Sequence, residues 1–326
     1  MDTVSSRQLN YAVFAGMAAP AAMLCSALPW PAALAGLGLA GLCWPVARRG
    51  LAETLPSPLR GAYLLWILLL MAKLAAMSRA CFQDTTGFIP VILLALAGTA
   101  ARSGAKIGAR LGAVLWAGLA VLLGGLLACA MADFTWNKLT ASHGLTWGWT
   151  EAAALGFAPA ALLCLPREEP GGLRWGFWLA AGLGAAASVV SCGVLGPLRV
   201  RLQQPLYDMV RGVNVLGSAV RLEALLSAAL SVGFFCAMSL LCAAGASVVR
   251  PWLARGAYPT VGYGVAAAAL ALSAPAATLP GETWFALSVA FGLMAPAVLW
   301  VLRSGSKKET SKKPRKCQVF CAKKIE

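Results

Sequence analysis

Two short segments of the sequence combine glycine and proline inside long apolar runs. The first reads GMAAP, from Gly16 to Pro20, and the second reads LGFAP, from Leu155 to Pro159. Proline lacks a backbone N–H and clashes with the preceding helical turn, so each segment is expected to interrupt a helix. The freed N–H groups suit a carboxylate, and the freed carbonyls suit an ammonium group. The pair therefore indicates a site for a small molecule such as an amino acid.

The candidate ligand-binding residues at these interruptions are small or apolar. Glycine and alanine allow a ligand to approach the backbone closely. Tight packing between helices favours the same residue types, so the sequence leaves both interpretations open. The candidates are Gly16, Met17, Ala18, Ala19, Leu155, Gly156, Phe157 and Ala158. Phe157 together with Met17 suggests a ligand with a small or apolar side chain.

The composition is that of a membrane protein. Hydrophobic residues make up 60% of the chain and charged residues 12%, with a mean hydropathy of +0.74. Soluble domains are about half apolar and about a quarter charged. The apolar runs lack the alternation of barrel strands, so helices are expected to satisfy the backbone in lipid. Loop charges that set the orientation then explain the net charge of +15, without nucleic acid as a partner.

We expect a single all-α transmembrane domain over residues 1–303 with ten spanning helices. The predicted spans lie near residues 10–29, 31–47, 61–80, 86–102, 111–132, 148–165, 175–196, 222–247, 258–276 and 283–302. Residues 197–221 are too charged to cross the membrane and predict an outside surface helix or helix pair. Residues 304–326 are polybasic and predict a disordered cytoplasmic tail.

The two proline segments occupy equivalent places in this series. They lie in the first and sixth spans, and the letters around the prolines read APAAMLC and APAALLC. Because five spans separate them, the second half (about 147–303) enters the membrane from the side opposite to the first (about 8–133). This predicts an inverted repeat, in which matching interrupted helices point to a binding site. Chance recurrence in a chain rich in Ala and Leu is the alternative.

Placing both termini inside puts most Lys and Arg residues in inside loops.

Three polar residues within predicted spans are further ligand candidates. Lys73 lies about 18 Å into the third span, where a lysine costs about 2.5–3.5 kcal/mol at the membrane centre. It either faces an internal cavity or extends to the headgroups. Ser227 and Ser231 lie one turn apart on the eighth span and are placed to face a ligand. A serine bonding its own helix backbone is the commoner arrangement.

The sequence does not predict an enzyme. Hydrolases and acyltransferases need a nucleophile, a base and an orienting group, whereas His143 is the only histidine and lies in an outside loop. The ten cysteines lie mostly within apolar runs and predict buried hydrophobic side chains, so no metal or cofactor is expected. No Asp or Glu lies at mid-depth in a predicted span, which disfavours a carboxylate proton relay.

The N-terminal segment resembles a known family. VSSRQLNYAVFAGMAAPAAMLCSALP is similar to the start of the B subunits of spore germinant receptors, members of the amino acid–polyamine–organocation transporter superfamily. The shared features are a polar segment with the Arg7–Gln8 pair and a small-residue helix that ends in Leu28–Pro29.

Two further segments support the resemblance. QPLYDMVRGVNVLGSAVRLEALLSAALSVGFF matches a Pro-rich aliphatic segment followed by an Arg-x-acid pair, and GFIPVILLALAGTAARSGAKIGAR is a weaker match. The residues that stand in the family's positions are Pro205, Arg221, Glu223, Pro90, Gly104 and Arg110. The chain is short for this family and unusually rich in alanine.

The resemblance implies an amino acid permease (LeuT-like) fold, a five-plus-five inverted repeat with a ligand at broken helices one and six. It implies a nutrient-sensing subunit that binds an amino-acid-like ligand. The partners would be a membrane protein with soluble domains and a lipoprotein, in the bacterial cytoplasmic membrane or the spore inner membrane. Secondary amino acid transport is the alternative, and a membrane scaffold that binds no ligand is the third possibility.

Overall fold

The computed structural model describes residues 4–51, 55–84, 86–142, 148–165, 175–212, 222–253 and 260–312. Within these ranges the chain forms helices and turns and no β-strand. Seven of the described helices are long and apolar enough to cross a membrane, and three shorter apolar helices lie between them. The chain thus has the helices of a multi-pass membrane protein, and each of the ten predicted spans contains an apolar helix.

The long apolar helices are α1 (Ser6–Ser26), α2 (Trp30–Gly50), α3 (Ser57–Cys81), α5 (Ala105–Ala130), α8 (Trp175–Leu195), α10 (Glu223–Val249), and α13 (Gly281–Val289) continued by the π-helical η6 (Ala290–Met294) and α14 (Ala295–Lys312). The shorter ones are α4 (Phe88–Arg102), α7 (Trp149–Phe157) with the 3₁₀ helix η2 (Ala158–Cys164), and α11 (Val261–Ala271) with α12 (Ser273–Ala277). The connecting elements are η1 (Met131–Asp133), α6 (Trp136–Ala141), η3 (Gly196–Arg201), α9 (Pro205–Arg211) and η4 (Arg250–Trp252).

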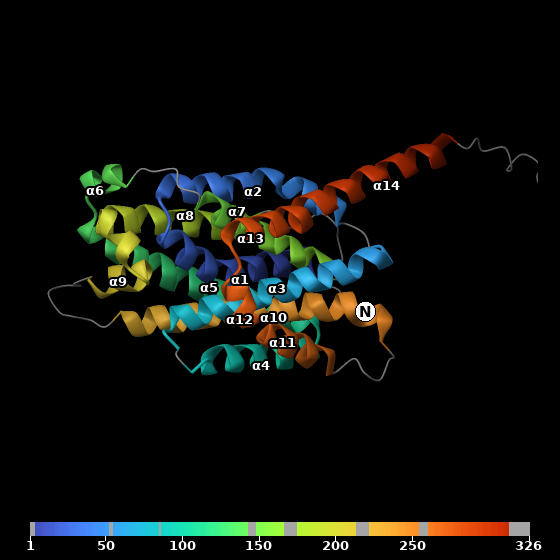
Figure 1. Cartoon of the computed structure of the whole chain (residues 1–326), viewed down its shortest axis with the longest axis horizontal. Coiled ribbons are helices and arrows are strands. Elements are labelled where there is room, and N and C mark those ends of the chain that lie inside the picture. Colours follow the sequence, from blue (N-terminus) through green and yellow to red (C-terminus); the bar gives the residue numbers. More distant parts are fainter. Residues whose placement is uncertain are drawn as a thin grey trace, which may run out of the picture.

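The two ends of the bundle differ in what they carry. The N-terminus and the C-terminal end of α14 lie toward one end, whereas α6 and α9 lie toward the other (Figure 1). η3 and α9 occupy the segment predicted as an outside surface helix, of which residues 213–221 lie outside the described ranges. α14 continues to Lys312, so a helix occupies the first part of the predicted disordered tail, and residues 313–326 lie outside the described ranges.

α1 is the central helix of the bundle. Its residues from Ala12 to Ala22 are all buried, as expected for a helix that is apolar on every face. α5, α8 and α10 pack around it. A Cβ at Gly176 of α8 would lie 2.0 Å from the Asn10 carbonyl oxygen, so only glycine allows this approach. Small residues therefore let α1 sit inside the protein instead of facing lipid.

The two proline segments fold differently. α1 is an unbroken α-helix through Pro20, so the prediction that helix one is broken was wrong. The packing of α5, α8 and α10 around α1 offsets the loss of the backbone hydrogen bond that Pro20 cannot donate. In the sixth span the α-helix does end at the predicted place, because the chain changes to 3₁₀ geometry at Ala158. Pro159 stands in the first turn of that new segment, where its missing N–H costs little.

Helix packing follows a regular scheme along the series of ten apolar helices. When each helix is replaced by the one five places along the series, the contact of α1 with α8 becomes the contact of α7 with α2, and that of α1 with α5 becomes that of α7 with α13. All four contacts are present. Under the same replacement, the contact of α4 with α10 becomes that of α11 and α12 with α3, which is also present. The contacts α3–α10 and α4–α11 each join two helices five places apart, so the replacement leaves them unchanged. These contacts are preserved when each helix is replaced by the one five places along, whereas the packing of α10 on α1 and on α5 has no counterpart of similar extent.

The turn between α1 and α2 is fixed by α8 and η3. The Leu28 carbonyl accepts hydrogen bonds from Ser188 Oγ at 2.8 Å and from Arg199 Nη1 at 3.1 Å. Ser191 Oγ donates to the Ser26 carbonyl at 2.7 Å. Arg199 is only 4% exposed and lies where α1 and α8 both end. Helix dipoles favour a cation at such C-terminal ends, so Arg199 is expected to stabilise the turn.

We predict that Arg199→Met lowers the free energy of unfolding by about 1.5–3 kcal/mol, the value typical of a hydrogen bond to a charged group. Arg201→Met is the matched control, because Arg201 lies in the same 3₁₀ helix but is exposed. Thermal unfolding of both variants in detergent measures the difference. Equal unfolding midpoints for the two variants would contradict this role of Arg199.

Candidate functional site

Two irregular helix segments meet in the interior of the bundle. One is the start of η2, where α7 ends at Phe157, and the other is the π-helical turn η6 between α13 and α14. A Cβ at Gly292 of η6 would lie 2.7 Å from Phe157 Cβ, so the two segments touch. π turns and changes of helix type displace backbone groups from the regular pattern and are frequent at functional sites.

An aromatic cluster on α3 fixes the π turn. Tyr63 Oη donates a hydrogen bond to the Phe291 carbonyl at 2.8 Å. The rings of Tyr63 and Trp66 lie 5.8 Å apart, and each lies 5.6–5.8 Å from the ring of Phe291. Both α3 residues are fully buried. The third span is thereby tied to the irregular part of the tenth.

Two buried polar atoms beside the π turn have no hydrogen-bond partner among the described residues. They are Trp66 Nε1 and Ser288 Oγ. Unpartnered buried donors are rare in proteins and usually signal a water or ligand. Sequence analysis missed Tyr63, Trp66 and Ser288. The available signal was a tyrosine and a tryptophan three residues apart in an apolar run, because a buried ring of either type usually needs a partner for its polar atom.

The predicted ligand residues of the first segment lie in unbroken α1. Gly16, Met17, Ala18 and Ala19 are all buried. A Cβ at Gly16 would lie 3.2 Å from the Ala237 Cα of α10, so this part of α1 packs closely on α10.

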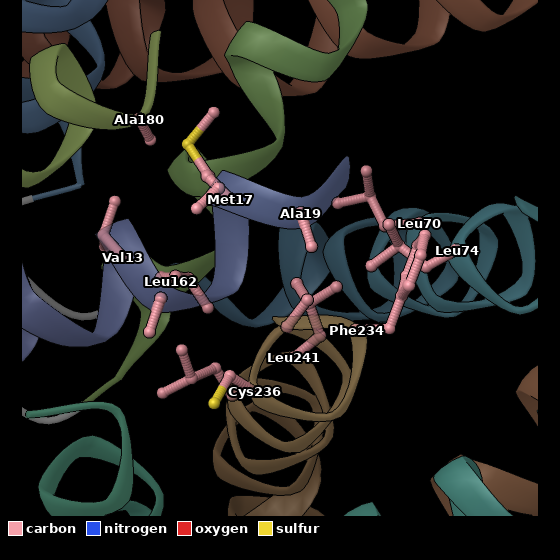
Figure 2. Close-up of a cluster of buried hydrophobic side chains, with 14 of the residues drawn as sticks. Val13, Met17, Ala19, Leu70, Leu74, Leu162, Ala180, Phe234, Cys236 and Leu241 are labelled. Atoms are coloured by element: carbon pink, nitrogen blue, oxygen red, sulfur yellow. The ribbon is translucent and has the colours of Figure 1, made fainter. Parts of the chain in front are cut away.

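Figure 2 shows what surrounds this part of α1. Met17 and Ala19 belong to an apolar cluster that also includes, among its labelled members, Val13, Leu70, Leu74, Leu162, Ala180, Phe234, Cys236 and Leu241. These side chains come from α1, α3, η2, α8 and α10. The centre of the predicted site is thus a packed apolar junction of five elements.

The predicted ligand residues of the second segment face other neighbours. A Cβ at Gly156 would lie 2.5 Å from Ala40 Cβ, which places Gly156 against α2. Leu155 and Phe157 are buried, and Ala158 is half-buried. The structure brings α1 against α7 and η2, but it directs Gly156 toward α2 and Phe157 toward η6. Ligand binding by these residues stays a prediction.

Lys73 lies away from the apolar cluster. It is half-buried and shares a stripe of α3 with exposed Leu65 and Ala80, whereas Leu70 and Leu74 point into the cluster (Figure 2). Of the two arrangements open in the sequence, this position favours a lysine whose charge extends toward the headgroups.

The two serine candidates are hydrogen-bonded within the protein. Ser227 Oγ lies 2.9 Å from Tyr207 Oη of α9, and Ser231 Oγ donates to the Ser227 carbonyl at 2.8 Å. Ser231 therefore adopts the commoner arrangement for a serine in a helix. Ser227 instead links α10 to α9.

The described residues contain no group of three His, Cys, Asp or Glu side chains that could hold a metal ion, and His143 lies outside the described ranges. Comparison of the chain with models of known protein families and with curated proteins gave no match. The geometry of the chain itself is therefore the basis for any functional proposal.

We predict that Gly156→Val lowers the free energy of unfolding by about 1–3 kcal/mol, because the added methyl groups collide with Ala40 and overpack the α7–α2 contact. Gly38→Val of α2 is the control, since a Cβ there meets nothing within 4 Å. Thermal unfolding of both variants in detergent tests the contact. Unchanged stability of Gly156→Val would show that α7 does not pack on α2 in this way.

Proposed function

We propose that the chain crosses the membrane ten times as two inverted five-helix repeats, in the fold of amino acid permeases. The support is that the contacts of α1 with α5 and α8 and of α4 with α10 each have a counterpart five helices along, as an inverted repeat requires. The packing of α10 on α1 and on α5 departs from this scheme. The loop charges support placement of both termini inside.

The three shorter helices are compatible with ten crossings. α7 with η2 measures about 27 Å, because an α-helical residue rises about 1.5 Å and a 3₁₀ residue about 2.0 Å. α4 measures about 22 Å and α11 with α12 about 25 Å on the same basis, against about 30 Å for the hydrocarbon core. α4 packs on α10 and α11 along one face, and on the other face Phe88, Val91 and Leu96 are exposed, as suits contact with lipid.

The function that this arrangement favours is detection of a small amino-acid-like nutrient by a membrane subunit of a spore germinant receptor. The observation that carries the proposal is the change of helix type at Ala158, which lies beside buried α1. Irregular backbone at membrane depth is tolerated where protein encloses it, and it commonly forms binding sites. The partners would be a membrane protein with soluble domains and a lipoprotein, in the bacterial cytoplasmic or spore inner membrane.

Secondary amino acid transport is the second candidate, because the proposed repeat is also a transporter architecture. The buried polar side chains of the described residues are hydroxyls together with Asn10 and Arg199. None of these is a carboxylate that titrates with a coupling proton, which favours sensing over proton-coupled transport.

The proposal predicts saturable binding of an amino acid to the purified chain in nanodiscs and no net flux. The assay is thermal unfolding with each of the twenty amino acids, because a ligand at 100 times its Kd stabilises the folded state by about 2.7 kcal/mol. Uptake into proteoliposomes is measured in parallel. Accumulation of the bound amino acid inside the proteoliposomes would favour secondary transport. Stabilisation by none of the twenty amino acids would favour a membrane scaffold that binds no ligand.

Two proline variants, measured in the same experiment, test where the ligand binds. Pro159→Ala allows the α-helix to continue past Ala158. It is expected to raise the apparent Kd of the ligand at least tenfold, and thereby to reduce the ligand-induced shift of the unfolding midpoint. Pro45→Ala is the control, because Pro45 lies inside α2 and is exposed. Equal shifts in the two variants would remove the site from the start of η2.

A further inference from the structure

A cavity of about 830 Å³ lies between the C-terminal end of α3, the start of α4, α12 and the segment that leads into α9. This volume falls within the range of about 300–1,000 Å³ that is usual for small-molecule sites. Gln203 and Gln204 place the cavity at the end of the bundle that carries α9. Ala75 is the lining residue that also belongs to the buried apolar cluster around α1, and the polar lining residues lie outside that cluster.

The walls of the cavity are built from short apolar side chains. Ala75 and Ala76 of α3 and Ala274 and Ala277 of α12 line it. Alanines on both sides leave space that larger residues would fill. The walls therefore suit a small apolar group.

The rim carries one group of each charge. Arg79 and Asp84 both line the cavity, and Arg79 Nε donates to the Asp84 carbonyl at 3.0 Å. Asp84 Oδ1 accepts hydrogen bonds from the backbone of Thr86 and Gly87 and from the Thr86 hydroxyl, while Oδ2 accepts the Ile89 N–H at 2.7 Å. The bond from the Thr86 hydroxyl and these backbone bonds lower the pKa of Asp84, so its carboxylate stays charged.

Gln83 is held in an unusual conformation at this rim. Its φ is +50°, and it is the one non-glycine residue with positive φ in the described ranges. Glycine would adopt this conformation without strain, whereas glutamine adds an amide that lines the cavity. This conformation ends α3, because the Asp84 N–H donates a hydrogen bond back to the Arg79 carbonyl at 3.0 Å, in the left-handed cap that is usual at a helix C-terminus.

We infer that this cavity is a second site for a zwitterionic amino acid with a short apolar side chain. The carboxylate is held by the Arg79 guanidinium and the Gln83 amide, the ammonium group lies at Asp84 Oδ2, and the side chain lies among the alanines. Arginine is suited to carboxylates because its planar fork matches their geometry. This inference rests on the proposed function, since it assigns the same class of ligand to a second place.

The test is binding stoichiometry by equilibrium dialysis in nanodiscs, with radiolabelled glycine, L-alanine, L-valine and L-leucine. Wild type is expected to bind two molecules of the tightest ligand per chain. Gln83→Gly and Ala274→Phe are each expected to bind one, and Pro159→Ala is expected to lose the other. Gln83→Gly should keep or raise the unfolding midpoint, which separates its effect from misfolding.

Two matched comparisons define the chemistry. Arg79→Gln should weaken the cavity site at least tenfold, whereas Arg201→Gln, an exposed arginine at the same end of the bundle, should not. The amide of the ligand and its deaminated acid should each bind the cavity site at least tenfold more weakly than the amino acid.

Three results would overturn the inference. Binding of one molecule per chain that Pro159→Ala abolishes and the cavity variants keep would refute the second site and leave the proposed function standing. No binding to wild type would refute both. Native mass spectrometry that finds a phospholipid released by Ala274→Phe, with amino acid binding unchanged, would assign the cavity to lipid. Loss of binding in the cavity variants alone would support the cavity and contradict the site at η2.

Discussion

A backbone N–H or carbonyl inside a bilayer has no water to bond, and the architecture of this chain depends on that constraint. Regular helices meet it over most of the sequence. Two departures from regular α-helix, η2 and η6, lie where neighbouring parts of the protein can bond or cover the backbone. Pro159 to Leu163 of η2 are buried, and the Phe291 carbonyl of η6 receives its bond from Tyr63. The contact between Phe157 and Gly292 brings these two irregular segments together.

The position of α1 follows from the same physics. A helix of small residues gains little from facing lipid, but it can approach other helices closely. Gly233 of α10 and Gly184 of α8 both abut α1, and the enclosed helix tolerates Pro20 without a break. α7, the helix five places later, instead changes type at its proline. If the halves are inverted repeats, α1 is the regular member of the central pair and α7 with η2 is the irregular one.

Local pattern predicted much of the fold, and long-range packing determined what it could not predict. Long apolar runs were enough to locate helices within all ten predicted spans, and Pro159 was enough to locate the change at Ala158. Whether Pro20 breaks its helix depends on the helices around it, which no local pattern reveals. The close contacts of Gly16 with α10 and of Gly156 with α2 likewise depend on tertiary packing. The bond from Tyr63 to Phe291 joins residues 228 positions apart. The sequence could indicate that buried Tyr63 and Trp66 need polar partners, but not that η6 lies beside them.

We propose that the two halves are inserted in opposite directions through ten crossings. Single cysteines at four exposed turn positions test it most directly, in a cysteine-free background labelled with a membrane-impermeant maleimide. Thr86 and Ser103 flank α4, while Leu253 and Thr278 flank α11 and α12. The account predicts outside labelling of Thr86→Cys and Thr278→Cys, and labelling of Ser103→Cys and Leu253→Cys only after permeabilisation. Labelling of Thr86→Cys and Ser103→Cys from the same side would show that α4 does not cross, and would contradict the inverted repeat.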